Sequence, residues 1–147
     1  MPTPTLIKFG YPETVIRDDG DWIVMARPQQ VTLGSLVLAS RRPVERFGAL
    51  DDEGFRALGP AVRQIEAALT AFVGYQKINY LMLMMVDPDV HFHVIPRYEG
   101  EREFGGMVFP DAGWPGPPDL KAAVTPAPEG MAALVEALRR NWPDAHA

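Results

Sequence analysis

Apolar residues along the chain follow the two periods that are typical of strands and of an amphipathic helix. The segment ETVIRDDGDWIVMAR, residues 13–27, predicts two short strands around a turn at Asp18–Gly20, because Asp-Gly favours positive φ. The segment TLGSLVLAS, residues 32–40, predicts a third strand. The segment KINYLMLMMV, residues 77–86, is apolar on both alternating faces, which is typical of a central strand. A further strand is expected over DVHFHVIPR, residues 89–97.

A helical period replaces this alternation in the middle of the chain. Asp51 or Asp52 can cap the start of a helix. The apolar stripe of this helix consists of Phe55, Leu58, Val62, Ile65, Leu69 and Phe72. Gly59-Pro60 interrupts the stripe without changing its phase, so we expect one kinked helix or a turn followed by a helix. The segment EGMAALVEALRRNW, residues 129–142, predicts a short terminal helix.

These elements predict an α+β fold, in which an antiparallel sheet of about five strands packs on one long helix. We expect residues 1–104 to form the domain itself. We expect residues 105–147, a glycine- and proline-rich segment followed by the short helix, to pack on the same domain. Within this segment, residues 105–130 hold too much glycine and proline for regular structure, which is typical of a functional, partner-covering or mobile stretch.

Composition excludes several classes of protein. The chain has 147 residues, of which 47% are hydrophobic and 22% charged, as expected for one globular domain. It has no cysteine, which excludes disulfides, thiolate metal sites and a cysteine nucleophile. Its net charge of −5 argues against binding along a nucleic-acid backbone. With no secretory signal and no apolar run of ~20 residues, we expect a cytoplasmic protein that does not enter the membrane.

The candidate chemistry lies in VDPDVHFHVIPRY, residues 86–98, which holds two of the three histidines of the chain. On a strand, Asp89, His91 and His93 share one face, and we expect this face to meet solvent while the other packs under the long helix. A neutral imidazole can attack phosphorus and form a covalent intermediate. A second histidine two residues away can then bind phosphoryl oxygens or handle the proton.

The same residues allow two other interpretations. His91, His93 and Asp89 are also the residue types of a metal site, but the remaining histidine, His146, lies next to the C-terminus. We therefore predict no metal site. The array can also be a hydrogen-bonded strand face without chemistry.

The histidine segment resembles a known family signature. VHFHVIPR, residues 90–97, is similar to the His-x-His-x-His signature of the histidine triad (HIT) superfamily, with the Pro-Arg of its fragile-histidine, dinucleoside-polyphosphate-hydrolase branch. LGSLVLASRRPVERFGAL, residues 33–50, resembles the strand and connector of the same branch. The resemblance covers about residues 20–100.

The resemblance implies a HIT-like α+β fold, a homodimer and a small-molecule nucleotide as the ligand. It implies that His91 is the nucleophile and His93 a phosphate contact, so that the chain hydrolyses or transfers nucleotides at the α-phosphate of dinucleoside polyphosphates or related conjugates. No cofactor is required, and Mg²⁺ is expected only as a counter-ion of the substrate. Pairing of an edge strand, either residues 31–40 or the histidine strand, also favours a homodimer.

Four further residues are predicted to bind substrate. Asp89 stands where the family has its first triad histidine, and Ser35 where a supporting histidine is frequent. Arg27 stands about where an asparagine contacts the ribose, and Arg97 directly follows the motif. Because an ionised Asp89 repels a polyphosphate, Asp89→His is predicted to raise activity on such substrates. The alternative is a nucleotide-binding protein with a degenerate triad and little turnover.

Overall fold

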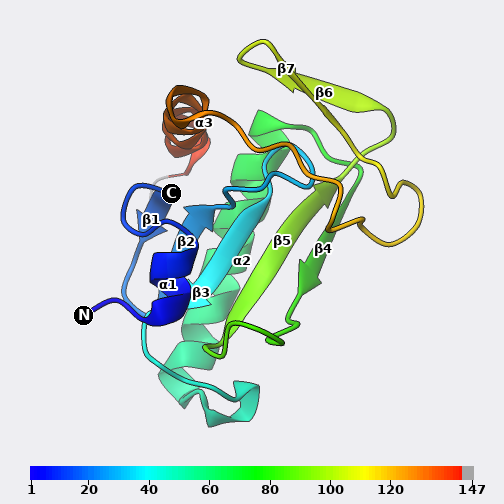
Figure 1. The fold of residues 1–147 in the computed structure, drawn as a ribbon. Helices are drawn as coiled ribbons and strands as arrows, with labels where there is room; N and C mark the ends of the chain where they lie inside the picture. The colour runs from blue at the N-terminus through cyan, green and yellow to red at the C-terminus, as the bar shows by residue number, and fades with distance from the viewer. Residues whose placement is uncertain (144–147) are drawn as a thin grey trace.

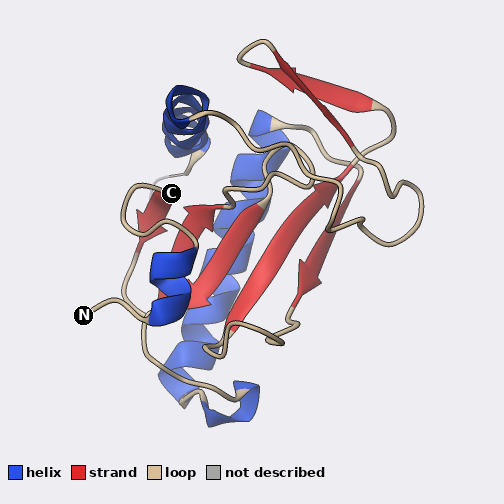
Figure 2. Ribbon diagram, in the orientation of Figure 1, coloured by secondary structure: helices blue, strands red, loops and turns tan. Residues whose placement is uncertain are grey.

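The computed structural model describes residues 1–143 and has a sheet covered by helices on both faces (Figure 1). In chain order the elements are α1 (Pro4–Lys8), β1 (Val15–Asp18), β2 (Trp22–Ala26), β3 (Leu36–Ser40), the 3-10 helix η1 (Phe47–Ala49), α2 (Asp52–Phe72), β4 (Lys77–Leu81), β5 (His91–Arg97), β6 (Glu101–Phe104), β7 (Met107–Pro110) and α3 (Pro128–Asn141). The long helix α2 lies behind the sheet and the short helix α1 in front of it (Figure 2).

The sheet is five-stranded and antiparallel, with the order β1-β2-β3-β5-β4, which confirms the predicted α+β class. Two predictions about individual strands are wrong. The segment 77–86 is not a central strand, because β4 lies at the edge of the sheet and ends at Leu81. The strands expected to be unpaired, β3 and β5, lie inside the sheet, and its edges are β1 and β4.

Helix α2 begins where the sequence predicts and provides the main core contact of the sheet. The side chain of Asp51 caps it by accepting a hydrogen bond of 2.8 Å from the amide of Gly54. The helix continues through Pro60, which shows that Gly59-Pro60 does not divide it. Ile65 and Leu69 are fully buried against the strands, so the apolar stripe is core.

The chain after β5 contains more regular structure than the sequence predicted. β6 pairs with β7 through a two-residue turn, in which Gly105 and Gly106 have positive φ values of 58° and 77°. Two successive positive φ values produce the turn that matches the twist of a hairpin, and glycine adopts them without strain. The prediction that residues 105–130 lack regular structure is therefore wrong for β7 and for the start of α3.

Helix α3 also contributes to the apolar core. Leu134 and Leu138 are buried in the same apolar cluster as the inner face of α2. The guanidinium of Arg139 donates two hydrogen bonds, of 3.0 and 2.6 Å, to the carbonyl oxygen of Val15 at the start of β1. Between β7 and α3, the chain crosses over the end of the sheet (Figure 1) and forms one isolated bridge, between Gln30 and Val124.

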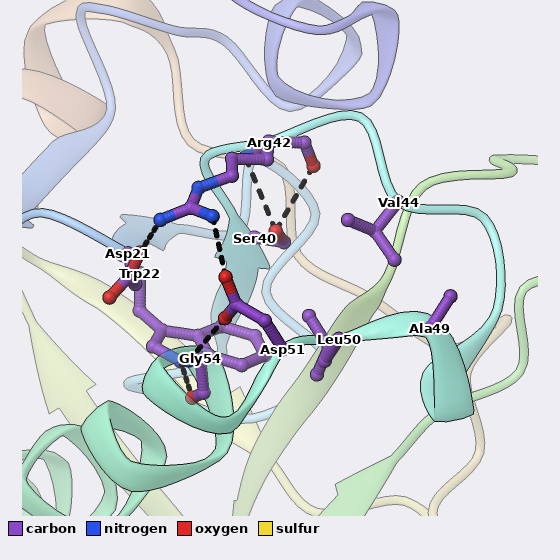
Figure 3. Close-up of a pocket in the computed structure, with 9 residues that line it drawn as sticks. All are labelled: Asp21, Trp22, Ser40, Arg42, Val44, Ala49, Leu50, Asp51 and Gly54. Atoms are coloured by element: carbon purple, nitrogen blue, oxygen red, sulfur yellow. Dashed lines mark hydrogen bonds and ion pairs between the residues drawn. The ribbon is translucent and has the colours of Figure 1, made fainter.

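The arginine-rich connector after β3 is tied to the fold. Arg42 forms salt bridges of 2.8 Å with both Asp21 and Asp51 (Figure 3). Beside it, the indole Nε1 of Trp22 donates a hydrogen bond of 2.8 Å to the carbonyl oxygen of Gly54. The cavity that remains between these residues has a volume of about 80 Å³. This is well below the ~300 Å³ at which small-molecule pockets begin, so the cavity is too small for a nucleotide.

No helix within residues 1–143 combines the length and the apolar character that a membrane crossing requires.

Candidate functional site

A cavity of about 360 Å³ lies at the start of β5, on the face of the sheet that α1 covers. It is lined by Lys8, Phe9, Arg27, Gln29, Leu83, Met84, Met85, Val86, Asp87, His91 and His93. The register of the sheet places the histidines here, because β5 pairs with β3 through Ala39↔His91 and Val37↔His93. The structure thus brings together three of the predicted site residues: both histidines and Arg27.

The ring of His91 is held by the backbone. Its Nδ1 lies 2.7 Å from the carbonyl oxygen of Asp89. Because a carbonyl only accepts hydrogen bonds, Nδ1 carries the proton and Nε2 carries the free lone pair. Nε2 forms no hydrogen bond with a described residue. Every fully buried side-chain nitrogen or oxygen in residues 1–143 has a hydrogen-bond partner, so Nε2 is not fully buried. Nε2 therefore keeps access to the cavity that the ring lines.

His93 has the opposite tautomer. The Nε–H of Arg27 donates a hydrogen bond of 3.3 Å to Nδ1 of His93, so Nδ1 is an acceptor and Nε2 carries the proton. Burial and the positive charge of Arg27 lower the pKa of His93 to about 4. His93 is therefore neutral at physiological pH and presents an N–H donor.

Helix α1 covers the histidine face, so the prediction that this face meets solvent is wrong. The ring of Phe9, which follows α1, lies 5.7 Å from the ring of His91 and 5.6 Å from that of His93, measured between centroids. The two imidazoles contact each other edge to face at 5.1 Å. The exposed fractions of His91 and His93 are only 1% and 8%. Only the edges that line the cavity remain accessible.

Two polar contacts attach α1 to the chain just before β5. The hydroxyl of Thr5 donates a hydrogen bond of 2.8 Å to the carboxylate of Asp89. The ammonium of Lys8 forms a salt bridge of 2.9 Å with Asp87. Asp89 is 4% exposed and is not part of the cavity lining. The repulsion expected between Asp89 and a polyphosphate requires its carboxylate in the cavity, whereas the structure directs it at Thr5.

Ser35 builds a turn and does not reach the histidines. Its Oγ donates to the carbonyl oxygen of Thr32 at 2.8 Å and accepts from the amide of Thr32 at 3.0 Å. The amide oxygen of Gln30 accepts from the backbone N–H groups of Gly34 and Ser35 in the same turn. Ser35 is completely buried and is not among the residues that line the cavity.

Arg97 lies at the opposite end of β5, away from the histidines. It forms a buried two-point ion pair with Asp111, at 2.7 and 3.0 Å, and donates to the side-chain oxygen of Asn79 at 2.8 Å. A second cavity, of about 420 Å³, lies beside Arg97, Asn79 and Trp114. It shares no lining residue with the histidine cavity. The structure does not bring Arg97 to the histidines.

The loop between β4 and β5 forms an apolar wall that the sequence did not reveal. Leu83, Met85 and Val86 are 47%, 87% and 81% exposed, and all three line the cavity. Met84 adopts a φ of 49°, a conformation that costs a non-glycine residue ~1 kcal/mol and is concentrated at functional sites. The apolar run of residues 77–86 concealed this loop, because exposed and buried apolar residues look alike in sequence.

Within residues 1–143, no three or more His, Asp or Glu side chains are placed to share a metal ion. His146, the remaining histidine, lies outside the described residues.

Comparison with known proteins gives a match only at the level of structure. No family model matches the sequence, and no curated protein matches it. The structure is similar to a histidine triad protein from Sinorhizobium meliloti, with a TM-score of 0.75, 22% identity and 96% of each chain covered. It is also similar to a hypothetical histidine triad nucleotide-binding protein from Sulfolobus tokodaii, with a TM-score of 0.67, 17% identity, and 93% of this chain and 88% of that chain covered.

A third similar structure is the C. elegans NitFhit protein, with a TM-score of 0.65 and 18% identity over 88% of this chain and 27% of that chain. Together these likenesses confirm the HIT fold that the sequence motif implied. The fragile-histidine branch stays a prediction.

Proposed function

We propose that this chain, which has the HIT fold, is a nucleotide hydrolase or nucleotidyl transferase that works through a nucleotidyl-histidine on His91. The observation that carries the proposal is the 2.7 Å contact between Nδ1 of His91 and the carbonyl oxygen of Asp89. This contact directs the unprotonated Nε2 at the cavity. It also stabilises the positive charge that develops on the ring when Nε2 attacks an electrophile.

In the proposed reaction, Nε2 of His91 attacks the α-phosphorus of a nucleotide conjugate. The P–Nε2 bond forms while the bond from phosphorus to the leaving group breaks, and the leaving group departs with the electron pair and is protonated by water. Water or an acceptor hydroxyl then attacks phosphorus, gives its proton to solvent and breaks the P–N bond. The products are a nucleoside monophosphate or a nucleotidylated acceptor, together with neutral His91.

The other groups in the cavity suit a phosphoryl group. His93 presents its Nε2–H as a donor for a phosphoryl oxygen, because its Nδ1 accepts from Arg27. Two cations and one carboxylate line the cavity: Lys8, Arg27 and Asp87. The volume of about 360 Å³ lies within the range of ~300–1,000 Å³ that is typical of small-molecule sites. Dinucleoside polyphosphates or related nucleotide conjugates are the proposed substrates, with Mg²⁺ only as their counter-ion.

The alternative is a nucleotide-binding protein with little turnover. Asp89 replaces the first histidine of the triad, and its carboxylate is bonded to Thr5 instead of lining the cavity. The cavity is therefore lined by two of the three histidines of the triad. If leaving-group departure depends on the missing one, binding persists while turnover is lost.

The test is to incubate the protein with a panel of adenylylated and guanylylated compounds and to measure released nucleoside monophosphate. His91→Gln is the matched variant, because it keeps a polar side chain at a position that is 1% exposed. We expect release by the wild type and a loss of about a thousandfold or more in His91→Gln. Nucleotide binding by calorimetry without release from any compound supports the alternative. Equal release by both proteins refutes His91 as the nucleophile.

A further inference from the structure

Arg27 lines the cavity beside His93 and is hydrogen-bonded to it. It follows β2 directly, and its Nε–H donates to Nδ1 of His93 at 3.3 Å. Its Nη1 donates to the carbonyl oxygen of Gln29 at 2.7 Å. These two bonds hold the guanidinium plane in one orientation, because they leave from different nitrogens of a rigid fork. Nη2 donates to no group within residues 1–143 and remains for a ligand in the cavity that Arg27 lines.

Arg27 is also the cation of the cavity that has no carboxylate partner among residues 1–143. The other cation, Lys8, is paired with Asp87 at 2.9 Å. Arg27 forms no salt bridge in the part of the chain that the structure describes, although it is half-buried. Burial lowers the pKa of its guanidinium, since no carboxylate offsets the lost hydration. A half-buried cation with free donors is unfavourable unless an anion arrives to pair with it.

We propose that Arg27 has two roles: it positions His93 with its Nε2–H toward the cavity, and it binds the anionic group of the ligand through Nη2. The first role is independent of the reaction. The second rests on the proposed function only for the identity of the anion, a phosphoryl oxygen.

The charges around His93 explain why this arrangement matters. Arg27, His91 and Lys8 disfavour a proton on His93, whereas Asp87 favours one. Burial also disfavours a proton on His93, and it is the largest cause of the low pKa of this residue. His93 is thereby a neutral donor, and the positive charge that a phosphate requires comes from Arg27. Arg27 thus supplies a positive charge beside the remaining two histidines of a triad in which Asp89 replaces the first.

The first experiment reads the ring of His93 by ¹⁵N NMR in the unliganded protein. In the wild type we expect the Nε2–H tautomer and titration near the pKa of about 4. In Arg27→Gln we expect the pKa to rise by about one unit or more and the tautomers to mix. Arg27→Lys keeps the charge and should keep the pKa low. If Arg27→Gln changes neither the tautomer nor the pKa, Arg27 does not position His93.

The control is Arg63→Gln, which removes the same charge from an exposed position on α2, at the opposite face of the sheet. It should leave the tautomer and pKa of His93 at wild-type values. A shift in this control equal to that in Arg27→Gln would mean that the net charge of the protein, not the contact, governs His93, and would overturn the positioning role.

The second experiment titrates inorganic phosphate into the same proteins and follows the ring resonances of His91 and His93. We expect saturable binding by the wild type and Arg63→Gln, and binding weaker by about tenfold or more in Arg27→Gln. Equal affinity in all three proteins, or no binding by the wild type, overturns the anion-binding role. Neither experiment requires turnover, so an inactive protein with the expected shifts would refute the proposed function and leave the role of Arg27 intact.

Discussion

Thr5 and Asp89 are separated by 84 positions in the sequence and are joined by a 2.8 Å hydrogen bond from hydroxyl to carboxylate. The bond attaches α1 to the chain immediately before β5. The carbonyl oxygen of the same Asp89 holds Nδ1 of His91. Asp89 therefore contacts the helix that covers the site, through its side chain and its amide, and the proposed nucleophile, through its carbonyl oxygen.

We expect Thr5→Val to lower the free energy of unfolding by about 1–3 kcal/mol, because the buried carboxylate of Asp89 loses a donor. Urea denaturation monitored by circular dichroism measures the loss. The control is Thr70→Val at an exposed position on α2, where we expect a change within about 0.5 kcal/mol. Equal values for the two variants would show that the bond contributes nothing to stability.

The contacts of Asp89 change the outcome that we expect for Asp89→His. Because the carboxylate contacts Thr5, a histidine there removes a buried hydrogen bond and does not relieve repulsion in the cavity. We expect a lower melting temperature and no gain in kcat/KM on dinucleoside polyphosphates. Asp89→Asn, which keeps an acceptor oxygen, should remain closer to the wild type in melting temperature. A stable Asp89→His protein with higher kcat/KM would support the repulsion argument from the sequence.

The pH dependence of stability should contain a contribution from His93. Its pKa is lowered to about 4 in the folded protein, so between pH ~6.5 and ~4 the unfolded chain binds more protons at this residue. The contribution to stability is complete above pH ~6.5 and is lost as the pH falls toward ~4, with a size of ~3 kcal/mol. Urea midpoints of the wild type and His93→Asn across this range measure it. Parallel pH profiles for the two proteins would contradict the lowered pKa.

The edge strand β4 is the expected site of self-association. Its residues, Lys77–Leu81, pair with β5 on one side and are exposed or half-buried. An unpaired edge is a template for pairing with a second copy, so we predict a homodimer through β4. Sedimentation at micromolar concentration should show twice the chain mass of 16.3 kDa, and Asn79→Pro should weaken the dimer. A species of only 16.3 kDa in the wild type would refute the prediction.

Local patterns in the sequence predicted the main layers of the fold. The stripe that includes Ile65 and Leu69 predicted α2, and the Asp-Gly turn predicted the β1–β2 hairpin. The hairpin around Gly105-Gly106 was also readable, because a two-residue glycine turn between short runs is a hairpin signal. This hairpin was missed because the glycines of the segment were interpreted only as a sign of irregular structure. Helix α1 has five residues and begins with Pro4, too short for a helical period to appear.

The site was only half predictable, because its geometry depends on contacts between distant residues. The spacing of His91 and His93 is local, so the sequence identified the pair. The contact of Arg27 with His93 joins residues 66 positions apart, and only the order of strands brings them together. The same holds for Phe9, which reaches both histidines from the chain end. Ser35 and Arg97 stand at family site positions in the sequence. In the structure, Ser35 is hydrogen-bonded within its own turn and Arg97 is paired with Asp111.

The most direct test of the central claim is to trap the covalent intermediate. The wild type and His91→Gln are incubated with the panel of adenylylated and guanylylated compounds, quenched with alkali and digested, and the peptides are analysed by mass spectrometry. Alkali is suitable because a phosphorus–nitrogen bond to imidazole survives it better than acid. We predict a nucleoside monophosphate adduct on His91 in the wild type and none in the variant. An adduct on another residue, or monophosphate release without any adduct on His91, would contradict the proposed mechanism.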